Sequence, residues 1–519
     1  MLDDASAIAS GALLEADICI IGGGAAGITI AREFIGTPHK VILLEGGGME
    51  IDAATQDLYR GANVGRPYYD LDACRLRFLG GTSNHWGGWC RPLSPVDFTK
   101  RPWVPHSGWP IDHDDLAPFY PRTGKILQLP VNKFDEAHLL EAHPGIRSFP
   151  FDPAAVHAEC YQFSPPTRFG EIYGPALKRA SNISVLLNAN VMAIDRDPGG
   201  SAIRSVRYAT LDGKHREVKA KTFILATGGI ENARILLASN IGNDHDLVGR
   251  FFMDHPEPIG GIVMLIDQRD PRWVPFVYSH PERVNEQESL GCLGISTARQ
   301  ARERINNVNV GFHYLPIVHS EGMTALQRLL EREETTVIPQ GTVGENLWHV
   351  VSDLEGVSRE TIDRMAHGKP VLQMAEVEVY GQQAPNPDSR VTLGEERDAL
   401  GIPRLKMNWR LTDFDRHSVD RTLRIVAEEF GRIGLGRIKL AFKDWAPDFY
   451  YGNHHMGTTR MSDDPKSGVV DADCRVFGVP NLYVAGSSVF PTSGNAPPTY
   501  TIIALALRLA DHLKANKGA

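Results

Sequence analysis

A glycine-rich turn near the N-terminus constrains the fold of this chain more than any other segment. Residues 16–21 form a short, nearly continuous apolar run, which is typical of a buried parallel strand. The turn Gly22–Gly27 follows at once, has the pattern G-x-G-x-x-G, and leads into a helix-like segment. Gly22 permits the tight turn, Gly24 lets the backbone approach a pyrophosphate, and Gly27 lets the helix pack against the strand. The pattern predicts a βαβ unit that binds a dinucleotide.

An acidic residue at the end of the next strand supports this prediction. The apolar residues 41–44 end at Glu45, eighteen residues after Gly27. A carboxylate at that distance accepts hydrogen bonds from a ribose 2′-hydroxyl, and its charge repels a 2′-phosphate. We therefore predict cofactor contacts from the following residues of this unit: Gly22, Gly24, Ala25, Ala26, Gly27 and Glu45.

Two later segments repeat the arrangement of a strand followed by glycine. Residues 222–229 form an apolar strand that ends in Thr-Gly-Gly and precedes a helix-like segment at 231–239, and residues 481–488 form a second such strand. Several turns of this kind around one ligand suit a long, enclosed FAD better than a dissociable nicotinamide, so we add Ala226 and Gly486 to the predicted cofactor contacts. Because no second G-x-G-x-x-G occurs, we expect the substrate itself to donate the electrons.

Composition excludes several other classes of protein. The 519 residues are enough for two domains, and a formal net charge of −9 without a basic block argues against nucleic acid as the main partner. The six cysteines lack metal-ligand spacing, so we predict reduced structural thiols and no metal. No apolar stretch approaches the length of a membrane span, and residues 1–16 lack the Lys or Arg of a signal peptide. These features predict a soluble, cytoplasmic protein.

The chain resembles the glucose–methanol–choline (GMC) FAD-dependent oxidoreductase superfamily along nearly its whole length. Within that superfamily it is most similar to the branch of pyranose oxidases, sugar dehydrogenase flavoproteins and bacterial glycoside 3-oxidases. The residues that carry the resemblance are Gly22–Gly27 with Glu45, Gly80–Trp86, Gly108–Ile111, Asp115–Tyr120, Ala226–Arg234, Val248–Arg250, Met253–Pro256, Pro385–Val391 and Asn453–Met461.

The resemblance implies an α/β (α+β) fold with two domains. A Rossmann-type FAD-binding domain would be built from the discontinuous segments 1–95, 170–255 and 445–519. A substrate-binding domain with a mainly antiparallel sheet would be built from 96–169 and 256–444. Residues 261–375 match the family least, so we expect substrate specificity to reside there.

A histidine in the loop Gly80–Trp86 matches the position at which pyranose 2-oxidases bond their flavin covalently. This residue is His85, and Thr82 and Asn84 of the same loop are implied cofactor contacts. Pyranose 2-oxidases place a threonine two residues after this histidine, whereas this chain has Gly87. Three alternatives stay open for His85: a covalent bond to FAD, non-covalent packing on the flavin, which we slightly favour, and a remote structural role.

Two adjacent histidines precede a Gly-Thr pair near the C-terminus. Oxidation of an alcohol by a flavin needs a base for the hydroxyl proton, and a neutral imidazole suits that task. The family places this histidine three residues before Gly-Thr, which here selects His454 as the catalytic base and leaves His455 with a structural role.

The second catalytic residue of the family, His or Asn, falls by the same counting on Pro497, whose side chain has no hydrogen-bonding group. Asn495 lies two residues earlier in the same loop. Either Asn495 takes the catalytic role through a reshaped loop, or His454 is the only strong base and Asn495 orders the loop. We favour the first interpretation.

The motifs and the resemblance together predict an enzyme that oxidises a ring secondary hydroxyl of a sugar or glycoside to a keto-sugar. Oxidation at C3 is favoured, with C2 as the alternative; the hydride would go to flavin N5, and O2, giving hydrogen peroxide, or a quinone would be the acceptor. One rival is a sugar dehydrogenase flavoprotein that passes electrons to an acceptor other than oxygen. A second is a flavin-containing lyase of the same fold.

Overall fold

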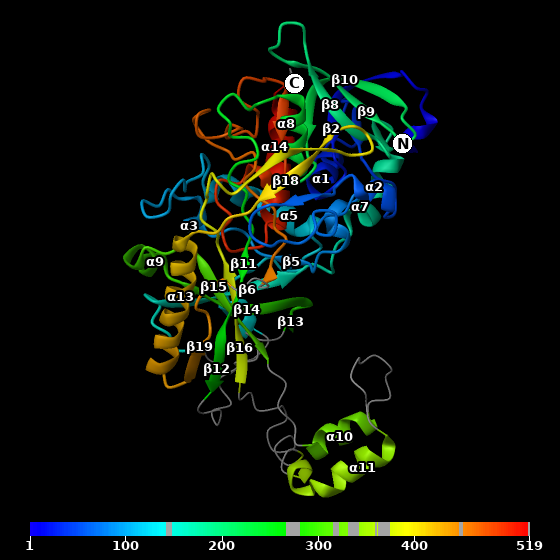
Figure 1. Cartoon of the computed structure of the whole chain (residues 1–519). Helices are drawn as coiled ribbons and strands as arrows, with labels where there is room; N and C mark the ends of the chain where they lie inside the picture. The colour runs from blue at the N-terminus through cyan, green and yellow to red at the C-terminus, as the bar shows by residue number, and fades with distance from the viewer. Residues whose placement is uncertain are drawn as a thin grey trace.

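The computed structural model describes residues 1–141, 148–265, 281–314, 321–330, 342–358, 361, 374–445 and 450–516. Figure 1 shows two bodies of regular structure, one above the other, each built around a β-sheet. Both chain termini lie in the upper body.

The upper sheet has eight strands in the order β1-β7-β3-β2-β10-β9-β8, with β21 paired to β10. The central pairings β2–β3, β2–β10 and β10–β21 are parallel, whereas β9 runs antiparallel to β10. The strands of this sheet are β1 Leu2–Asp4, β2 Leu13–Ile21, β3 Val41–Leu44, β7 Ile183–Leu187, β8 Asn190–Arg196, β9 Ile203–Ala209, β10 His215–Leu225 and β21 Leu482–Val484. The predicted strand–turn–helix is present, because α1 (Ala25–Glu33) follows β2 and packs against α14 (Thr499–Ala515) and α7 (Phe169–Arg179).

The lower sheet also has eight strands, in the order β19-β12-β16-β15-β14-β6-β5, with β13 paired to β14. Every pairing in it is antiparallel. Its strands are β5 Trp89–Cys90, β6 Val156–Phe163, β12 Ile259–Leu265, β13 Glu282–Val284, β14 Gln287–Ile295, β15 Val308–Tyr314, β16 Met374–Gly381 and β19 Gly436–Leu440. One face of this sheet packs on α13 (Asp413–Arg432) around Val377, Val379, Val419 and Leu423. The predicted fold class, a Rossmann-type unit combined with an antiparallel sheet, is confirmed.

A small third sheet modifies the division of the chain into domains. It joins β4 (Gly61–Asn63) to β17 (Arg390–Arg397) and β18 (Pro403–Asn408), and it lies beside α8 (Glu231–Ser239) in the upper body (Figure 1). Val391, Leu405, Met407 and Trp409 are buried in the same core as the first βαβ unit. We therefore propose that the FAD-binding domain also takes in the strands within residues 390–408, which the predicted segment 256–444 assigned to the substrate domain.

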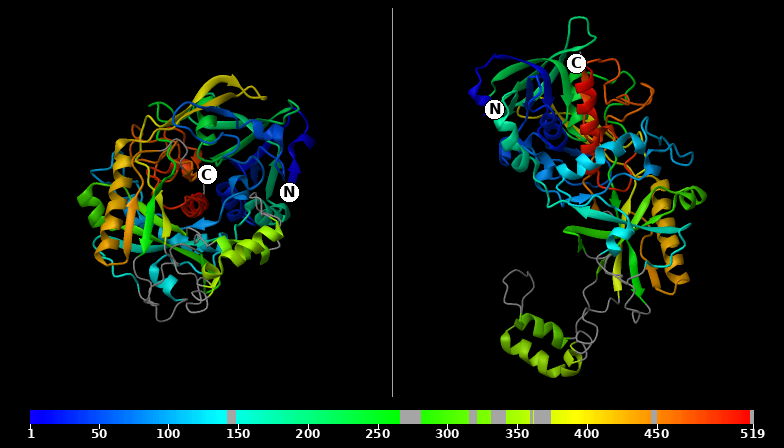
Figure 2. Two further views of the ribbon diagram at one scale, coloured as in Figure 1. Left: turned by 60° about the horizontal axis from the view of Figure 1, so that its bottom comes forward. Right: turned by 180° about the vertical axis from the view of Figure 1, so that it is seen from behind.

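Two helices, α10 (Glu321–Leu330) and α11 (Val343–Ser352), pack on each other and stand apart from both bodies in the right view of Figure 2. The remaining elements are short: α2 Ala53–Asp57, α3 Pro95–Phe98, α4 His113–Leu116, α5 Tyr120–Ile126, α6 Glu136–Leu140, α9 Thr297–Glu303, β11 Pro256–Glu257 and β20 Tyr450–Tyr451. Among the described residues, we find no helix whose length and apolar character would let it cross a membrane. All six cysteines are buried and unpaired.

Candidate active site

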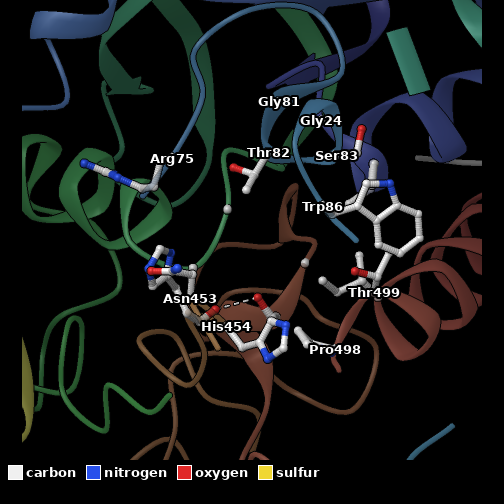
Figure 3. Close-up of a pocket in the computed structure, with 18 of the residues that line it drawn as sticks. Gly24, Arg75, Gly81, Thr82, Ser83, Trp86, Asn453, His454, Pro498 and Thr499 are labelled. Atoms are coloured by element: carbon white, nitrogen blue, oxygen red, sulfur yellow. Dashed lines mark hydrogen bonds between the residues drawn. The ribbon is translucent and has the colours of Figure 1, made fainter. Parts of the chain in front are cut away.

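A cavity of about 620 Å³ lies between the two bodies, and most of the predicted site residues line it. The carboxyl ends of β2, β3 and β10 open into it from the upper sheet, as expected for ligand binding by an open parallel sheet. Side chains of β5, β6 and β16 line it from the lower sheet. In Figure 3, Thr82 and Trp86 reach it from the loop Gly80–Trp86, and Pro498 and Thr499 reach it from the start of α14.

The three glycines of the first turn are required for three different reasons. Gly22 has φ +104°, and a Cβ there would lie 2.5 Å from the carbonyl oxygen of Ala226. A Cβ on Gly27 would lie 2.0 Å from the carbonyl oxygen of Gly22, so only glycine lets the helix approach the turn. Around Gly24, by contrast, no described atom lies within 4 Å of the Cβ position, and Gly24 lines the cavity. The space beside Gly24 is therefore left for a ligand.

The carboxyl group of Glu45 lies at the same end of the cavity. It accepts hydrogen bonds from the backbone N–H groups of Gly23 and Gly47, both at 2.8 Å. Each carboxylate oxygen has a second lone pair, so the group can still accept a hydrogen bond from a hydroxyl in the cavity. Burial raises the pKa of Glu45, although the two backbone N–H groups and nearby Arg77 act in the opposite direction.

The other predicted cofactor contacts divide into two groups. Most of them line the cavity: Ala25, Ala26, Thr82, His85, Ala226 and Gly486. Asn84 does not, because its side-chain amide donates hydrogen bonds to the carbonyl oxygens of Leu79 and Gly81 at 3.0 Å each and so closes its own loop. Burial lowers the pKa of His85, with a further contribution from Arg168.

Sequence reasoning missed a group of charged residues at the Glu45 end. Arg75 and Arg77 both line the cavity and pair with buried Glu231, at 3.3 and 3.5 Å, and both guanidinium groups lie over the ring of Tyr59. The sequence around these arginines does not predict their place in the site, because their partner Glu231 belongs to α8, about 155 residues further along the chain. Their position gives this end of the cavity two fixed cationic donors.

At the other end of the cavity, His454 is held by a motif from a distant part of the chain. The Nδ1 atoms of His454 and His255 are 2.9 Å apart, and the two rings are nearly perpendicular. The carboxylate of Asp254 accepts the backbone N–H groups of both histidines at 2.7 Å, and it also accepts the hydroxyl of Tyr68. A Cβ on Gly452 would lie 2.4 Å from Nδ1 of His454, so position 452 needs a glycine to leave room for the His454 ring.

The hydrogen-bond pattern assigns the protons of the histidine pair. Nε2 of His255 faces the carbonyl oxygen of Ser493 at 3.4 Å, and a carbonyl only accepts, so this nitrogen carries the proton. Nδ1 of His255 is then an acceptor, and Nδ1 of His454 must be the donor in the bond between the rings. The unprotonated nitrogen of His454 is therefore Nε2, which is the form a general base requires.

Burial keeps both imidazoles neutral. It lowers the pKa of His255 to about 4, and it lowers the pKa of His454 well below the ordinary value, with a further contribution from the neighbouring His255. Both His454 and His255 line the cavity, and His255 also holds His454 through the bond between their Nδ1 atoms. We regard His255 as a positioning residue, which the sequence contained in Met253–Pro256 without revealing its spatial partner.

His455 has a different environment from its neighbour. It is buried, its ring lies against Tyr68 and Phe252, and its carbonyl oxygen accepts the hydroxyl of Ser487 at 2.6 Å. Burial lowers its pKa to about 3. These contacts are those of a packing residue, although His455 also lines the cavity, and its structural role stays a prediction.

Asn495 lines the same cavity but makes no hydrogen bond to His454 in the described part of the chain. Its Oδ1 accepts from Arg91 at 2.7 Å, and its Nδ2 donates to Oδ1 of Asn309 at 2.6 Å. Asn309 in turn donates to Glu159, which also pairs with Arg91. The side chain is thus held rigidly, with one amide hydrogen left for another partner.

Two family models match the chain. Residues 17–298, more than half of the sequence, match FAD dependent oxidoreductase, and residues 385–506 match the C-terminal domain of GMC oxidoreductase. The chain therefore belongs to the FAD dependent oxidoreductases and carries a GMC oxidoreductase C-terminal domain. FAD is its cofactor, and it is an enzyme of the class that acts on CH–OH groups.

Among curated relatives, the chain is 28% identical to fructose dehydrogenase large subunit of Gluconobacter japonicus over 66% of its own length and 56% of that protein's length. It is 24% identical to 6'''-hydroxyparomomycin C oxidase of Streptomyces lividus over 97% and 93%. It is 35% identical to C-glycoside 3-oxidase of Arthrobacter globiformis over 21% of each chain. Among solved structures, pyridoxine 4-oxidase from Mesorbium loti superposes with a TM-score of 0.57 at 17% identity, covering 96% and 99% of the two chains, which supports the fold alone.

The residues present fit FAD. Besides Gly24, the Cβ positions of Gly228 and Gly486 meet no described atom within 4 Å, and all three line the cavity. The glycine-lined space therefore runs from Glu45 past the ends of β10 and β21 towards His454. Gly22–Gly24 and Ala25 at the start of α1 would hold the pyrophosphate, and Glu45 would hold the ribose.

Proposed function

We propose that this enzyme oxidises a ring secondary hydroxyl of a sugar or glycoside to a keto-sugar, with C3 favoured over C2. The observation that carries the proposal is the neutral His454, whose Nε2 is free to accept a proton at the edge of the glycine-lined cavity. Relatives that bear the names of sugar and glycoside oxidising enzymes support this substrate class.

In this proposal His454 accepts the proton of the substrate hydroxyl at Nε2. When bound, FAD supplies the acceptor for the hydride that leaves the carbinol carbon. His255 fixes the tautomer and the orientation of His454 through the bond between their Nδ1 atoms, and Asp254 fixes the backbone of both residues. Asn495 offers its remaining amide hydrogen to the oxygen that develops negative charge.

Anaerobic mixing with sugars and aryl glycosides tests the proposal. A substrate is expected to bleach the oxidised flavin absorbance without oxygen, and the product is identified as the 3-keto or 2-keto sugar. Readmitting either O2 or a quinone then distinguishes an oxidase from a dehydrogenase that needs another acceptor. A lyase of this fold would convert its substrate without bleaching, and failure of every sugar to bleach the flavin would contradict the proposal.

Asn495→Ala is expected to lower kcat by about two orders of magnitude and to change KM much less, because a donor to developing charge acts mainly in the transition state. Steady-state kinetics on the bleaching sugar measure both constants. The matched control is Thr492→Val in the same loop, whose hydroxyl bridges Trp109 and the carbonyl oxygen of Asp97 outside the cavity. An unchanged kcat in Asn495→Ala, or an equal loss in Thr492→Val, would leave Asn495 with only a loop-ordering role.

Non-covalent packing of His85 is the alternative we favour, so FAD is expected to leave the protein when the holoenzyme is precipitated with acid. Absorbance of the supernatant and flavin fluorescence of the washed pellet on a denaturing gel measure the two fractions. His85→Ala serves as the comparison, since His85 is the only histidine of the loop Gly80–Trp86 and lines the cavity. Flavin retained in the wild-type pellet and absent from that of His85→Ala would establish the covalent bond instead.

A further inference from the structure

The lower sheet presents alternate residues of one strand to the cavity. Along β16, Ala375, Val377 and Val379 are buried in the core beneath α13, whereas the residues between them are only half-buried. Of this second set, Glu378 and Tyr380 line the cavity. The alternation follows from the two-residue period of a strand, so the substrate side of the cavity is built from one face of an antiparallel sheet.

A second acidic residue reaches the same part of the cavity from β11. Glu257 lines it, and the neighbouring Pro256 packs on the end of β16, since a Cβ on Gly381 would lie 2.9 Å from the Pro256 carbonyl oxygen. The Cβ position of Gly452 lies 3.1 Å from Oε1 of Glu257 and 2.4 Å from Nδ1 of His454. The Glu257 carboxyl group is therefore a close neighbour of the catalytic base.

The two carboxyl groups differ in their hydrogen bonding. Oε2 of Glu378 accepts the hydroxyl of Tyr380 at 2.8 Å, whereas the described residues offer the carboxyl group of Glu257 no hydrogen bond. Burial raises the pKa of Glu257 to about 8, and the nearby acids Asp254 and Glu378 add to the effect. The other titratable groups beside it are Tyr380 and the neutral His454. At neutral pH Glu257 is therefore protonated and can donate a hydrogen bond, whereas the neighbouring Glu378 accepts one.

Aromatic rings complete this part of the cavity. Trp89 and Tyr161 pack edge to face at 5.1 Å, and both lie 5.8 Å from Tyr380. All three line the cavity beside Glu378. Flat aromatic surface next to a few fixed polar groups suits a ring that has apolar faces and a polar rim.

We propose that Glu257 and Glu378 bind neighbouring hydroxyl groups of the substrate ring, Glu257 as hydrogen-bond donor and Glu378 as acceptor, and thereby determine which ring hydroxyl faces His454. The inference rests on the proposed function in taking a polyhydroxylated ring as the substrate. It assigns the specificity of the site to a donor–acceptor pair that comes from two adjacent strands.

Three variants test the pair: Glu378→Gln, Glu257→Gln and Glu257→Ala. The probe is the simplest sugar that bleaches the wild-type flavin, together with its 2-deoxy and 4-deoxy analogues. Glu378→Gln is expected to raise KM by about tenfold or more and to lose the discrimination against one deoxy analogue. Glu376→Gln is the matched control, because this residue lies on the same strand and the same face but does not line the cavity.

The pH dependence of KM separates the two acids. The wild-type KM is expected to rise as the pH passes about 8, because Glu257 ionises there, loses its donor hydrogen and repels Glu378. Glu257→Gln, whose amide donates at every pH, should keep the KM at neutral pH and remove that rise, whereas Glu257→Ala should raise KM throughout. Flavin content and thermal unfolding show whether each variant is folded.

Two results would overturn the inference while leaving the proposed function intact. One is a wild-type enzyme that oxidises the sugar but whose KM changes no more in Glu378→Gln than in Glu376→Gln. The other is a preference for an amino sugar that both Gln variants abolish, which would mean that the acids bind an ammonium group as two carboxylates. If no sugar bleaches the wild-type flavin, the proposed function fails before the variants are compared.

Discussion

Replacing His454 by alanine is expected to lower kcat/KM at neutral pH by about three orders of magnitude, within the range that general-base catalysis contributes. The substrate hydroxyl would lose the acceptor at Nε2 of His454, and Nε2 of His255, the other ring of the pair, carries a proton and faces the carbonyl oxygen of Ser493. The pH profile gives an independent measurement. Since burial holds the pKa of His454 well below its ordinary value, the wild-type kcat/KM should stay flat from neutral pH to below about 6.5.

The control for this variant is His455→Asn, which changes the adjacent packing residue. It is expected to lower the thermal stability of the protein and to keep His454 in place to accept the proton of the substrate hydroxyl. Both variants should retain FAD, as measured by absorbance per protein. A His454→Ala enzyme with a tenth or more of the wild-type kcat/KM, or a wild-type profile that falls around pH 6.5, would contradict the assignment of the base.

Gly24→Val is expected to yield a folded protein without bound FAD. Gly24 has φ −83° and ψ −171°, a backbone conformation that valine adopts readily, and its Cβ position meets no described atom within 4 Å. The new Cβ therefore meets no described atom, and the side chain occupies the space over which the pyrophosphate would lie. Flavin absorbance per protein, together with far-ultraviolet circular dichroism, measures the two properties separately.

Two other glycines provide the comparison. Gly431 in α13 also has an unobstructed Cβ position, so Gly431→Ala should keep both the fold and the FAD. A Cβ on Gly27 would lie 2.0 Å from the carbonyl oxygen of Gly22, so Gly27→Ala should destabilise the fold itself. Normal flavin content in Gly24→Val would show that the cofactor does not pass over this turn.

The sequence predicts the upper body well because its signals are local. The strand at 41–44 and the helix at 231–239 have the bounds found in the structure, since the strand is an apolar run that ends at Glu45 and the helix ends before Asn240. The strand expected at 16–21 is longer than predicted and begins at Leu13, where the half-exposed residues no longer look like a buried strand.

What the sequence missed depends on contacts between distant segments. His255 and His454 are 199 residues apart, and their hydrogen bond exists only because β11 pairs with β20 next to the cavity. The third sheet likewise joins β4 to β18 across more than 300 residues. Neither pairing has a signal in periodicity or spacing, whereas the family resemblance, through the count back from Gly457, predicts His454 and not His455 as the base.

The alternation along β16 has a consequence for how this enzyme can change. Ala375, Val377 and Val379 hold the sheet to α13, and the positions between them meet the ligand space without taking part in that packing. Substitutions at Glu378 and Tyr380 can therefore alter the preferred substrate while the buried residues keep the scaffold intact. Such a strand allows the preferred substrate to change, in natural evolution or in a directed-evolution library, with little loss of folding stability.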